Sequence, residues 1–173
     1  MLSNYLQTLN QTTSQINIAD FNSMSDLVEK ANSIFVIGNG GSYAIAEHFC
    51  TDLIKFCHKD ARSLSNGSLL TMSANDYGYS NIFSSFAPNT DLVFALSTSG
   101  QSENIVNAMC QFYNAKKILL CGFGGRGFKT KIDCKAIIPN SCAQILEDSF
   151  SIICHALTLE VKLRIGAKTC FQP

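Results

Sequence analysis

The chain has 173 residues, of which 46% are hydrophobic and 15% charged, and its 13 basic and 13 acidic residues cancel. This length is typical of one domain with a buried core. The charged fraction lies below the roughly 25% of an average protein, which indicates that part of the surface is buried in an oligomer. The neutral balance argues against a nucleic-acid-binding protein that works by neutralising phosphates.

The chain contains no segment typical of a membrane protein or of a secreted one. No apolar stretch approaches the roughly 18 residues of a transmembrane helix, and the first residues, MLSNYLQTLNQTTSQ, lack the basic start and apolar centre of a signal peptide. The eight cysteines form no C-x-x-C motif. Cys110, Cys121 and Cys154 lie in apolar segments, and Cys50 and Cys57 share one helical face. We therefore predict reduced, mostly structural thiols, a cytoplasmic location and no membrane partner.

Strands are expected to alternate with helices after two N-terminal helices. The first helix is predicted at 2–15, and the second begins at Asp20 as its N-cap and ends near Ala31. The remaining elements are a strand at 33–38, a helix at 42–57, a weaker strand at 61–65, short helices within 67–86 around a loop at 74–83, a strand at 91–97, a helix at 102–115, a strand at 117–123, a glycine-rich loop at 124–130, a strand at 134–139 and a long helix at 143–165. This order predicts one α/β domain, with N-terminal helices at 1–32 and a core at 33–173. Its parallel sheet is expected to be covered on both faces.

The segment STSGQS follows the apolar strand DLVFAL and is the first candidate binding loop, because ligands of open parallel sheets bind beyond the carboxyl ends of the strands. It supplies the hydroxyls of Ser97, Thr98, Ser99 and Ser102, while Gly100 permits a tight turn. The following helix adds free N–H groups at its positive end. These features predict an uncharged phosphate cradle. The alternative is a plain Ser/Thr cap on a surface helix.

The segment GNGGS follows the apolar strand SIFVI and is the second candidate binding loop. It is not a dinucleotide fingerprint, because Tyr43 stands where the third glycine of G-x-G-x-x-G belongs, and no lysine-containing P-loop occurs. Gly40 and Gly41 allow close backbone approach, and Asn39 and Ser42 offer hydrogen bonds to a polyol.

Titratable side chains recur on the two helices beside these loops. His48 and Asp52 are four residues apart and share a helix face, and the last helix carries Glu147, Asp148 and His155. Each also has a purely structural explanation. His48 would be a half-buried histidine, Asp52 a solvated helix charge, and His155 a core histidine within SIICHAL. Glu147 and Asp148 would be acids favoured by the dipole at a helix start.

The order of four motifs resembles a known family. GNGGS, then EHF with an acid four residues after the histidine, then ANDYGY and STSGQS resemble the sugar isomerase (SIS) domain, and more narrowly the phosphoheptose isomerases, over about residues 20–165. The resemblance implies a three-layer, flavodoxin-like fold with a five-stranded parallel sheet. It implies a homotetramer whose N-terminal helices build the tetramer core and whose active sites lie between subunits. The implied reaction converts sedoheptulose 7-phosphate to D-glycero-D-manno-heptose 7-phosphate, or acts on a related sugar, in lipopolysaccharide or capsule biosynthesis.

The resemblance also implies one zinc ion per subunit, bound by a histidine and a glutamate four apart and by a glutamine and a histidine eight apart on the last helix. The matching residues are His48, Asp52, Glu147 and His155, so Asp52 replaces the glutamate and Glu147 the glutamine. The substituted set still consists of residue types that bind zinc. Residues 147 and 155 lie about 12 Å apart along a helix. They therefore bracket one ion only with extended side chains, or the ligands come from two subunits, and Asp148 is an alternative ligand.

Roles follow from the same resemblance. Asp52 is expected to be the base that moves a proton between C1 and C2 through an enediol, and His155 the acid or proton shuttle. The substrate is expected to contact Asn39, Gly40, Gly41, Ser42, Asn75, Asp76, Ser97, Thr98, Ser99, Ser102 and Glu147. An arginine expected soon after the acid is absent, and Lys55 is the nearest cation. The alternatives are a non-catalytic module that binds a phosphosugar or a protein partner, and a different phosphosugar reaction.

Overall fold

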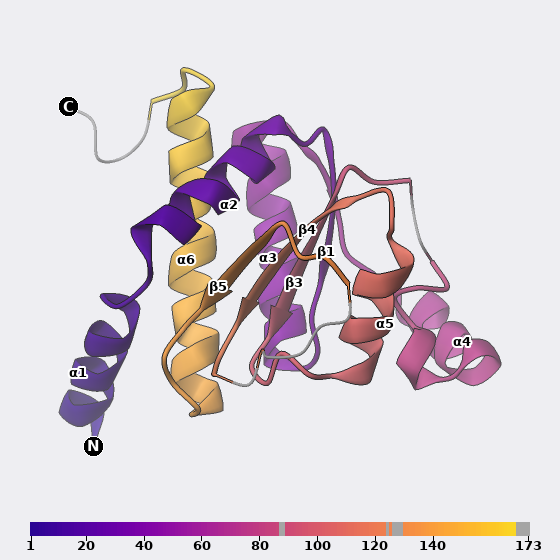
Figure 1. Ribbon diagram of the computed structural model, residues 1–173, viewed down its shortest axis with the longest axis horizontal. Helices are drawn as coiled ribbons and strands as arrows, with labels where there is room; N and C mark the ends of the chain where they lie inside the picture. The colour runs from indigo at the N-terminus through magenta and orange to yellow at the C-terminus, as the bar shows by residue number, and fades with distance from the viewer. Residues whose placement is uncertain (87–88, 124, 126–129, 169–173) are drawn as a thin grey trace.

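The computed structural model describes residues 1–86, 89–123, 125 and 130–168, which form three layers around one parallel sheet (Figure 1). The strand order is β2-β1-β3-β4-β5, and every neighbouring pair is parallel. This is the flavodoxin-like order, so the predicted fold class is confirmed. The strands are β1 (Ser33–Ile37), β2 (Asp60–Arg62), β3 (Leu92–Ser97), β4 (Lys116–Cys121) and β5 (Cys134–Ile137).

Helices cover both faces of the sheet. One face carries α2, α3 and α6, and the other carries α4, η1 and α5 (Figure 1). The helices are α1 (Leu2–Thr13), α2 (Ile18–Lys30), α3 (Gly41–Cys57), α4 (Gly67–Tyr77), the 3-10 helix η1 (Tyr79–Asn81), α5 (Glu103–Gln111) and α6 (Ala143–Arg164). None of the helices in the described part of the chain is both long and apolar enough to cross a membrane.

The central strand β3 shows why the sheet needs both helix layers. All six of its residues are buried, which is the near-continuous apolar run expected of a strand covered on both faces. Phe94 points into the layer of α3 and α6, where its ring meets that of Phe49 edge-on at 5.2 Å. Val93 and Ala95 point to the α5 side. The alternation along β3 therefore joins the two cores.

The N-terminal helices differ slightly from their prediction. Helix α2 begins at Ile18 because the side chain of Asn17 accepts hydrogen bonds from the backbone N–H groups of Ala19 and Asp20. The prediction that Asp20 is the N-cap is wrong. Asp20 lies in the first turn of α2, where its carboxylate still complements the helix dipole. Helix α1 contacts α6, and the Tyr5 hydroxyl donates to Asp148 Oδ2 at 2.7 Å.

Element ends account for most other differences. Strand β2 covers 60–62 and not the predicted 61–65, because pairing with β1 stops at Arg62. Helix α4 continues as far as Tyr77, into the segment predicted as a loop, and α5 stops at Gln111 rather than at 115. Of the predicted glycine-rich loop at 124–130, residues 124 and 126–129 lie outside the described residues.

The described cysteines are free thiols, and five of them are buried. Burial raises the pKa of the Cys50 thiol to about 12 and that of Cys57 and Cys121 to about 11. These thiols are therefore protonated at neutral pH and poor nucleophiles, as predicted for structural cysteines. Cys110 is exposed, although it lies in an apolar segment.

Candidate active site

Both candidate loops lie at the carboxyl edge of the sheet. GNGGS joins β1 to α3, and STSGQS joins β3 to α5. Strands β1 and β3 are neighbours, and the chain leaves them in opposite directions, to β2 on one side and to β4 on the other. This is the switch point at which flavodoxin-like sheets bind ligands.

The glycine loop brings a carboxylate to the start of α3. Gly40 is the N-cap of α3 and has φ +55°, a conformation that favours glycine. Gly41 lies against the carboxylate of Glu147, which occupies the space that a Cβ would need. The Ser42 hydroxyl donates to Glu147 Oε1 at 3.5 Å. Glu147 is therefore held where the positive end of α3 stabilises a negative charge.

The hydroxyl loop keeps its donors available. The oxygen of Ser97 accepts the N–H of Gly100 and that of Ser99 accepts the N–H of Gln101, both at 3.1 Å. Each hydroxyl therefore still has its O–H to donate. Ser102 is the N-cap of α5, yet its side chain makes no capping hydrogen bond. This arrangement suits an anion better than a plain helix cap, in which Ser102 would bond to its own helix. Ser97 is buried and shapes the loop, and Thr98, half-buried, completes the set.

An amide pair connects the two loops. Asn39 Nδ2 donates to Asn104 Oδ1 at 2.9 Å, and Asn104 Nδ2 donates to Asn39 Oδ1 at 2.8 Å. The Tyr79 hydroxyl donates to the same Asn39 oxygen at 3.2 Å. Neither Asn104 nor Tyr79 was predicted from the sequence to be a site residue. The sequence feature that could have indicated Asn104 is a polar residue next to Ile105 on the apolar side of its helix. In the structure Asn104 is only 2% exposed.

Three predicted ligands converge between α3 and α6. The Nε2 atoms of His48 and His155 are 2.9 Å apart. Asp52 Oδ2 lies 3.6 Å from the first and 3.7 Å from the second. Two atoms bound tetrahedrally to one zinc ion, at about 2.0–2.1 Å each, stand about 3.3 Å apart. The chemistry and spacing of the three donor atoms therefore fit a zinc site.

The cluster of His48, Asp52 and His155 is open on one side. The two histidine side chains are 57% and 51% exposed, whereas that of Asp52 is 13% exposed. The structure does not bring Glu147 into this cluster, because its carboxylate lies at the start of α3. Asp148 is also outside the cluster and is bound to Tyr5.

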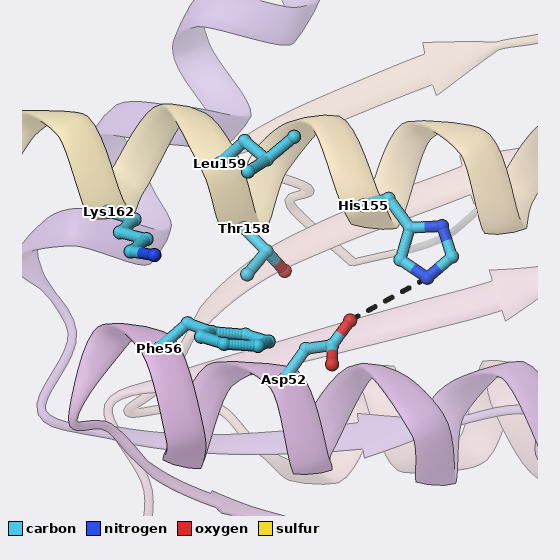
Figure 2. A pocket seen from close by; sticks show the side chains of 6 residues that line it. All are labelled: Asp52, Phe56, His155, Thr158, Leu159 and Lys162. Carbon is cyan, nitrogen blue, oxygen red and sulfur yellow. Dashed lines mark ion pairs between the residues drawn. The ribbon is translucent and has the colours of Figure 1, made fainter. Parts of the chain in front are cut away.

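A cavity of about 330 Å³ adjoins the cluster in the groove between α3 and α6 (Figure 2). Its lining comprises Asp52, Phe56, His155, Thr158, Leu159 and Lys162. The Lys55 and Lys162 ammonium groups lie 4.8 Å and 5.1 Å from the centre of the Phe56 ring. Lys55, considered as a substitute for the absent arginine, therefore packs over Phe56.

Asn75 and Asp76 lie near the end of α4 and are exposed. Asn75 Nδ2 donates to Asp76 Oδ1 at 2.7 Å. Within the described residues, neither side chain forms a hydrogen bond with the two loops. His58, the remaining histidine of the chain, is exposed at the end of α3.

Comparisons with known proteins identify the family to which the chain belongs. The family described as the SIS domain matches residues 2–116. The chain is 31% identical to the phosphoheptose isomerase of Nitratiruptor sp. over 76% of this chain and 77% of the relative. It is 33% identical to that of Leptospira biflexa over 72% and 71%. A solved phosphoheptose isomerase from Francisella tularensis superposes with a TM-score of 0.84, covering 94% and 96% of the two chains at 23% identity, and shows the same fold.

A substitution of Gly41 by alanine tests the position of Glu147. In Gly41→Ala, the new Cβ meets the Glu147 carboxylate, which must leave the start of α3. We expect kcat/KM for the substrate to fall about tenfold or more, because a carboxylate in the site moves, with little loss of thermal stability. The control is Gly67→Ala, at the first residue of α4, where a Cβ meets nothing within 4 Å. Equal kinetics in the two variants would show that Glu147 has no role.

Proposed function

This chain belongs to the phosphoheptose isomerase family of SIS-domain proteins, and we propose that it interconverts sedoheptulose 7-phosphate and its aldose isomer, D-glycero-D-manno-heptose 7-phosphate. The observation that carries the proposal is the convergence of His48, Asp52 and His155 between α3 and α6. A family member that only bound a sugar or a protein partner would have no need of this cluster. The non-catalytic alternative is therefore not favoured.

The reaction needs one base and one acid near C1 and C2. In the ketose-to-aldose direction, a proton leaves C1 and the C2 carbonyl oxygen gains one, which gives an enediol. C2 is then protonated and the O1 hydroxyl loses its proton. We assign the carbon-bound proton to Asp52, because its carboxylate is ionisable, largely buried and fixed between two imidazoles. His155, half-exposed at the cavity, is assigned to the oxygen-bound protons.

The phosphate is assigned to Thr98, Ser99 and Ser102 and to the N-terminus of α5. Support comes from the O–H groups of this loop, which donate to no acceptor within the described residues, and from the missing capping hydrogen bond of Ser102. The sugar hydroxyls are assigned to the backbone of Gly40 and Gly41 and to the side chains of Ser42 and Glu147.

We further propose that zinc is the resident metal, one ion per chain, which would be held by the Nε2 atoms of His48 and His155 and by one oxygen of Asp52. The second Asp52 oxygen and the Nδ1 atom of His155 then remain for the proton transfers. When bound, the ion supplies Lewis-acid polarisation of the substrate carbonyl. Glu147 remains a candidate fourth ligand only if it leaves the start of α3 or comes from another subunit.

An oligomer is supported by two features. Leu2 and Leu6 on α1 are 71% and 54% exposed, so a row of apolar side chains lacks cover in the single chain. His48 lies seven residues beyond Gly41, or about 10 Å along α3, which separates the cluster from the glycine loop. We propose a homotetramer, built on the N-terminal helices, in which neighbouring subunits complete each site. The protein would act in the cytoplasm.

Substitution of Asp52 by asparagine tests the proposed base. Asp52→Asn preserves shape but cannot accept a proton, so we expect kcat to fall by about 10²–10⁴-fold while binding of the phosphosugar persists. Turnover of sedoheptulose 7-phosphate is followed by NMR of the product, and binding by calorimetry. Asp148→Asn, which alters the carboxylate bound to Tyr5 outside the cluster, serves as the control. Full activity in Asp52→Asn would show that Asp52 is not the base.

Zinc binding is tested by equilibrium dialysis of the metal-stripped protein, with bound metal measured by mass spectrometry. We expect one equivalent per wild-type chain and loss of that equivalent in His48→Gln and in His155→Gln, because each removes one of three clustered donors. His58→Asn changes the exposed histidine at the end of α3 and is expected to retain the metal. Equal zinc content in all four proteins would exclude this cluster as the metal site.

The oligomer is tested by light scattering. The wild type is expected at four times the 18.9 kDa of one chain. The double variant Leu2→Lys with Leu6→Lys should dissociate, because each leucine contributes about 1.5–3 kcal/mol when fully buried. Leu69→Lys, on α4, is the control. A monomeric wild type would overturn the proposal.

A further inference from the structure

The side chains of Asn39, Asn104 and Tyr79 form a hydrogen-bonded group that spans the two loops. Asn39 lies in the glycine loop and Asn104 in the first turn of α5, directly after the hydroxyl loop. Their amides exchange two hydrogen bonds, at 2.9 Å and 2.8 Å. Asn104 is 2% exposed, whereas Asn39 is half-buried and borders the open edge of the sheet. The pair therefore fixes one loop against the other.

The orientation of both amides is determined by a backbone group. The N–H of Ile105 donates to Asn104 Oδ1 at 3.0 Å, so this atom must be the oxygen. Asn39 must then turn its nitrogen toward Asn104 Oδ1 and its oxygen toward Asn104 Nδ2. The hydroxyl of Tyr79 donates to that same Asn39 oxygen at 3.2 Å.

Counting donors and acceptors shows what remains for a ligand. An amide oxygen accepts two hydrogen bonds and an amide nitrogen donates two. Both oxygens of the pair are fully occupied: that of Asn39 by Asn104 and Tyr79, and that of Asn104 by Asn39 and Ile105. Asn39 keeps one N–H without a partner among the described residues. Toward the site, Asn39 can therefore donate but not accept.

We propose that Asn104 is a positioning residue that aligns the two loops and, with Tyr79, restricts Asn39 to donating one N–H to an oxygen lone pair of the phosphosugar. This inference rests on the proposed function for the identity of the ligand. It restricts the expected hydrogen bond of Asn39 to donation, because its oxygen already accepts from Asn104 and Tyr79. The ligand atom that faces Asn39 is a phosphate, carbonyl or hydroxyl oxygen acting as acceptor.

The alignment should act on binding more than on chemistry. Asn104 contacts Asn39, whereas His48, Asp52 and His155 lie further along α3 and α6 and touch neither amide. Loss of the pair leaves Asn39 free to rotate, so it offers its oxygen as often as its nitrogen and loosens the loop at Gly40.

The test compares Asn104→Ala, Asn39→Ala, the double variant and Tyr79→Phe in the full-length protein. We expect KM for sedoheptulose 7-phosphate to rise about tenfold in Asn104→Ala, with kcat within about twofold of the wild type, from the loss of one hydrogen-bonded contact. Asn39→Ala and the double variant should match it, because Asn104 acts through Asn39. Tyr79→Phe, at a residue 59% exposed and harmless to folding, should raise KM about threefold.

Hydrogen exchange separates this proposal from the proposed function. Amides of residues 38–42 should exchange faster in Asn104→Ala than in the wild type, whether or not the protein turns over the heptose phosphate. The control is Asn17→Ala, which removes an amide with two hydrogen bonds at the start of α2, away from both loops. Unchanged exchange and unchanged KM in Asn104→Ala and in Tyr79→Phe, or the same changes in Asn17→Ala, would overturn the positioning role. If the wild type does not convert sedoheptulose 7-phosphate but exchange responds as expected, the substrate assignment fails and the link between the loops stands.

Discussion

The packing of α3 against α6 is the contact on which the site depends. Helix α3 contributes His48 and Asp52 to the cluster, and α6 contributes His155. The same two helices bring Glu147 to the start of α3. Between these polar points the contact is apolar and fully buried, through Phe49, Leu53, Ala46, Phe150 and Leu157. Two helices held this rigidly by close-packed side chains can maintain donor atoms at fixed separations, which proton transfer and metal binding both require.

The sheet supplies the second constraint, because it places both loops at one edge. Asn39 follows β1 and Asn104 follows the loop after β3, so strands that are neighbours at the switch point bring distant segments into hydrogen-bond contact. The phosphate cradle contains no lysine or arginine among its described residues and relies on O–H and N–H donors. In the further proposal above, Asn39 adds one more N–H donor on the side of the sugar. In the proposed site, oriented O–H and N–H dipoles rather than net charge would recognise the anionic ligand, in agreement with the neutral composition of the chain.

Much of the fold could be predicted from the sequence because apolar runs and helical spacing are local patterns that identify single strands and helices. The apolar run of β3 and the spacing of Phe150 and Leu157 on α6 each specify an element and its buried face. The ends of elements were less predictable. Asn17 rather than Asp20 caps α2, and α4 runs through a segment rich in residues typical of turns, because caps and tertiary contacts decide such boundaries. Exposure of Cys110 likewise depends on which way α5 faces the sheet.

The side-chain cluster between α3 and α6 was predictable only where residues of one helix share a face. His48 and Asp52 follow from i, i+4 spacing, and His155 joined them through resemblance rather than through any pattern in its own segment. Asn104 could not be predicted from local patterns, because its hydrogen-bond partner Asn39 is 65 residues away in the sequence. Glu147 was assigned to the metal, yet in the single chain it lies at the positive end of α3, a position that only the packing of two helices creates.

The shorter carboxylate of Asp52 is the main departure from the family pattern to which the chain was compared, and its surroundings bear on its proposed role as the base. Aspartate reaches one methylene less than glutamate, so its oxygens stay closer to α3. In this chain both histidines converge on that position, and Asp52 Oδ2 is almost equidistant from their Nε2 atoms. One turn further on, Phe56 lines the adjoining cavity, with Lys55 and Lys162 over its ring. In the proposed role of Asp52 as the base, the shorter side chain places the reacting position closer to α3, and the adjoining cavity gives the substrate room to approach it.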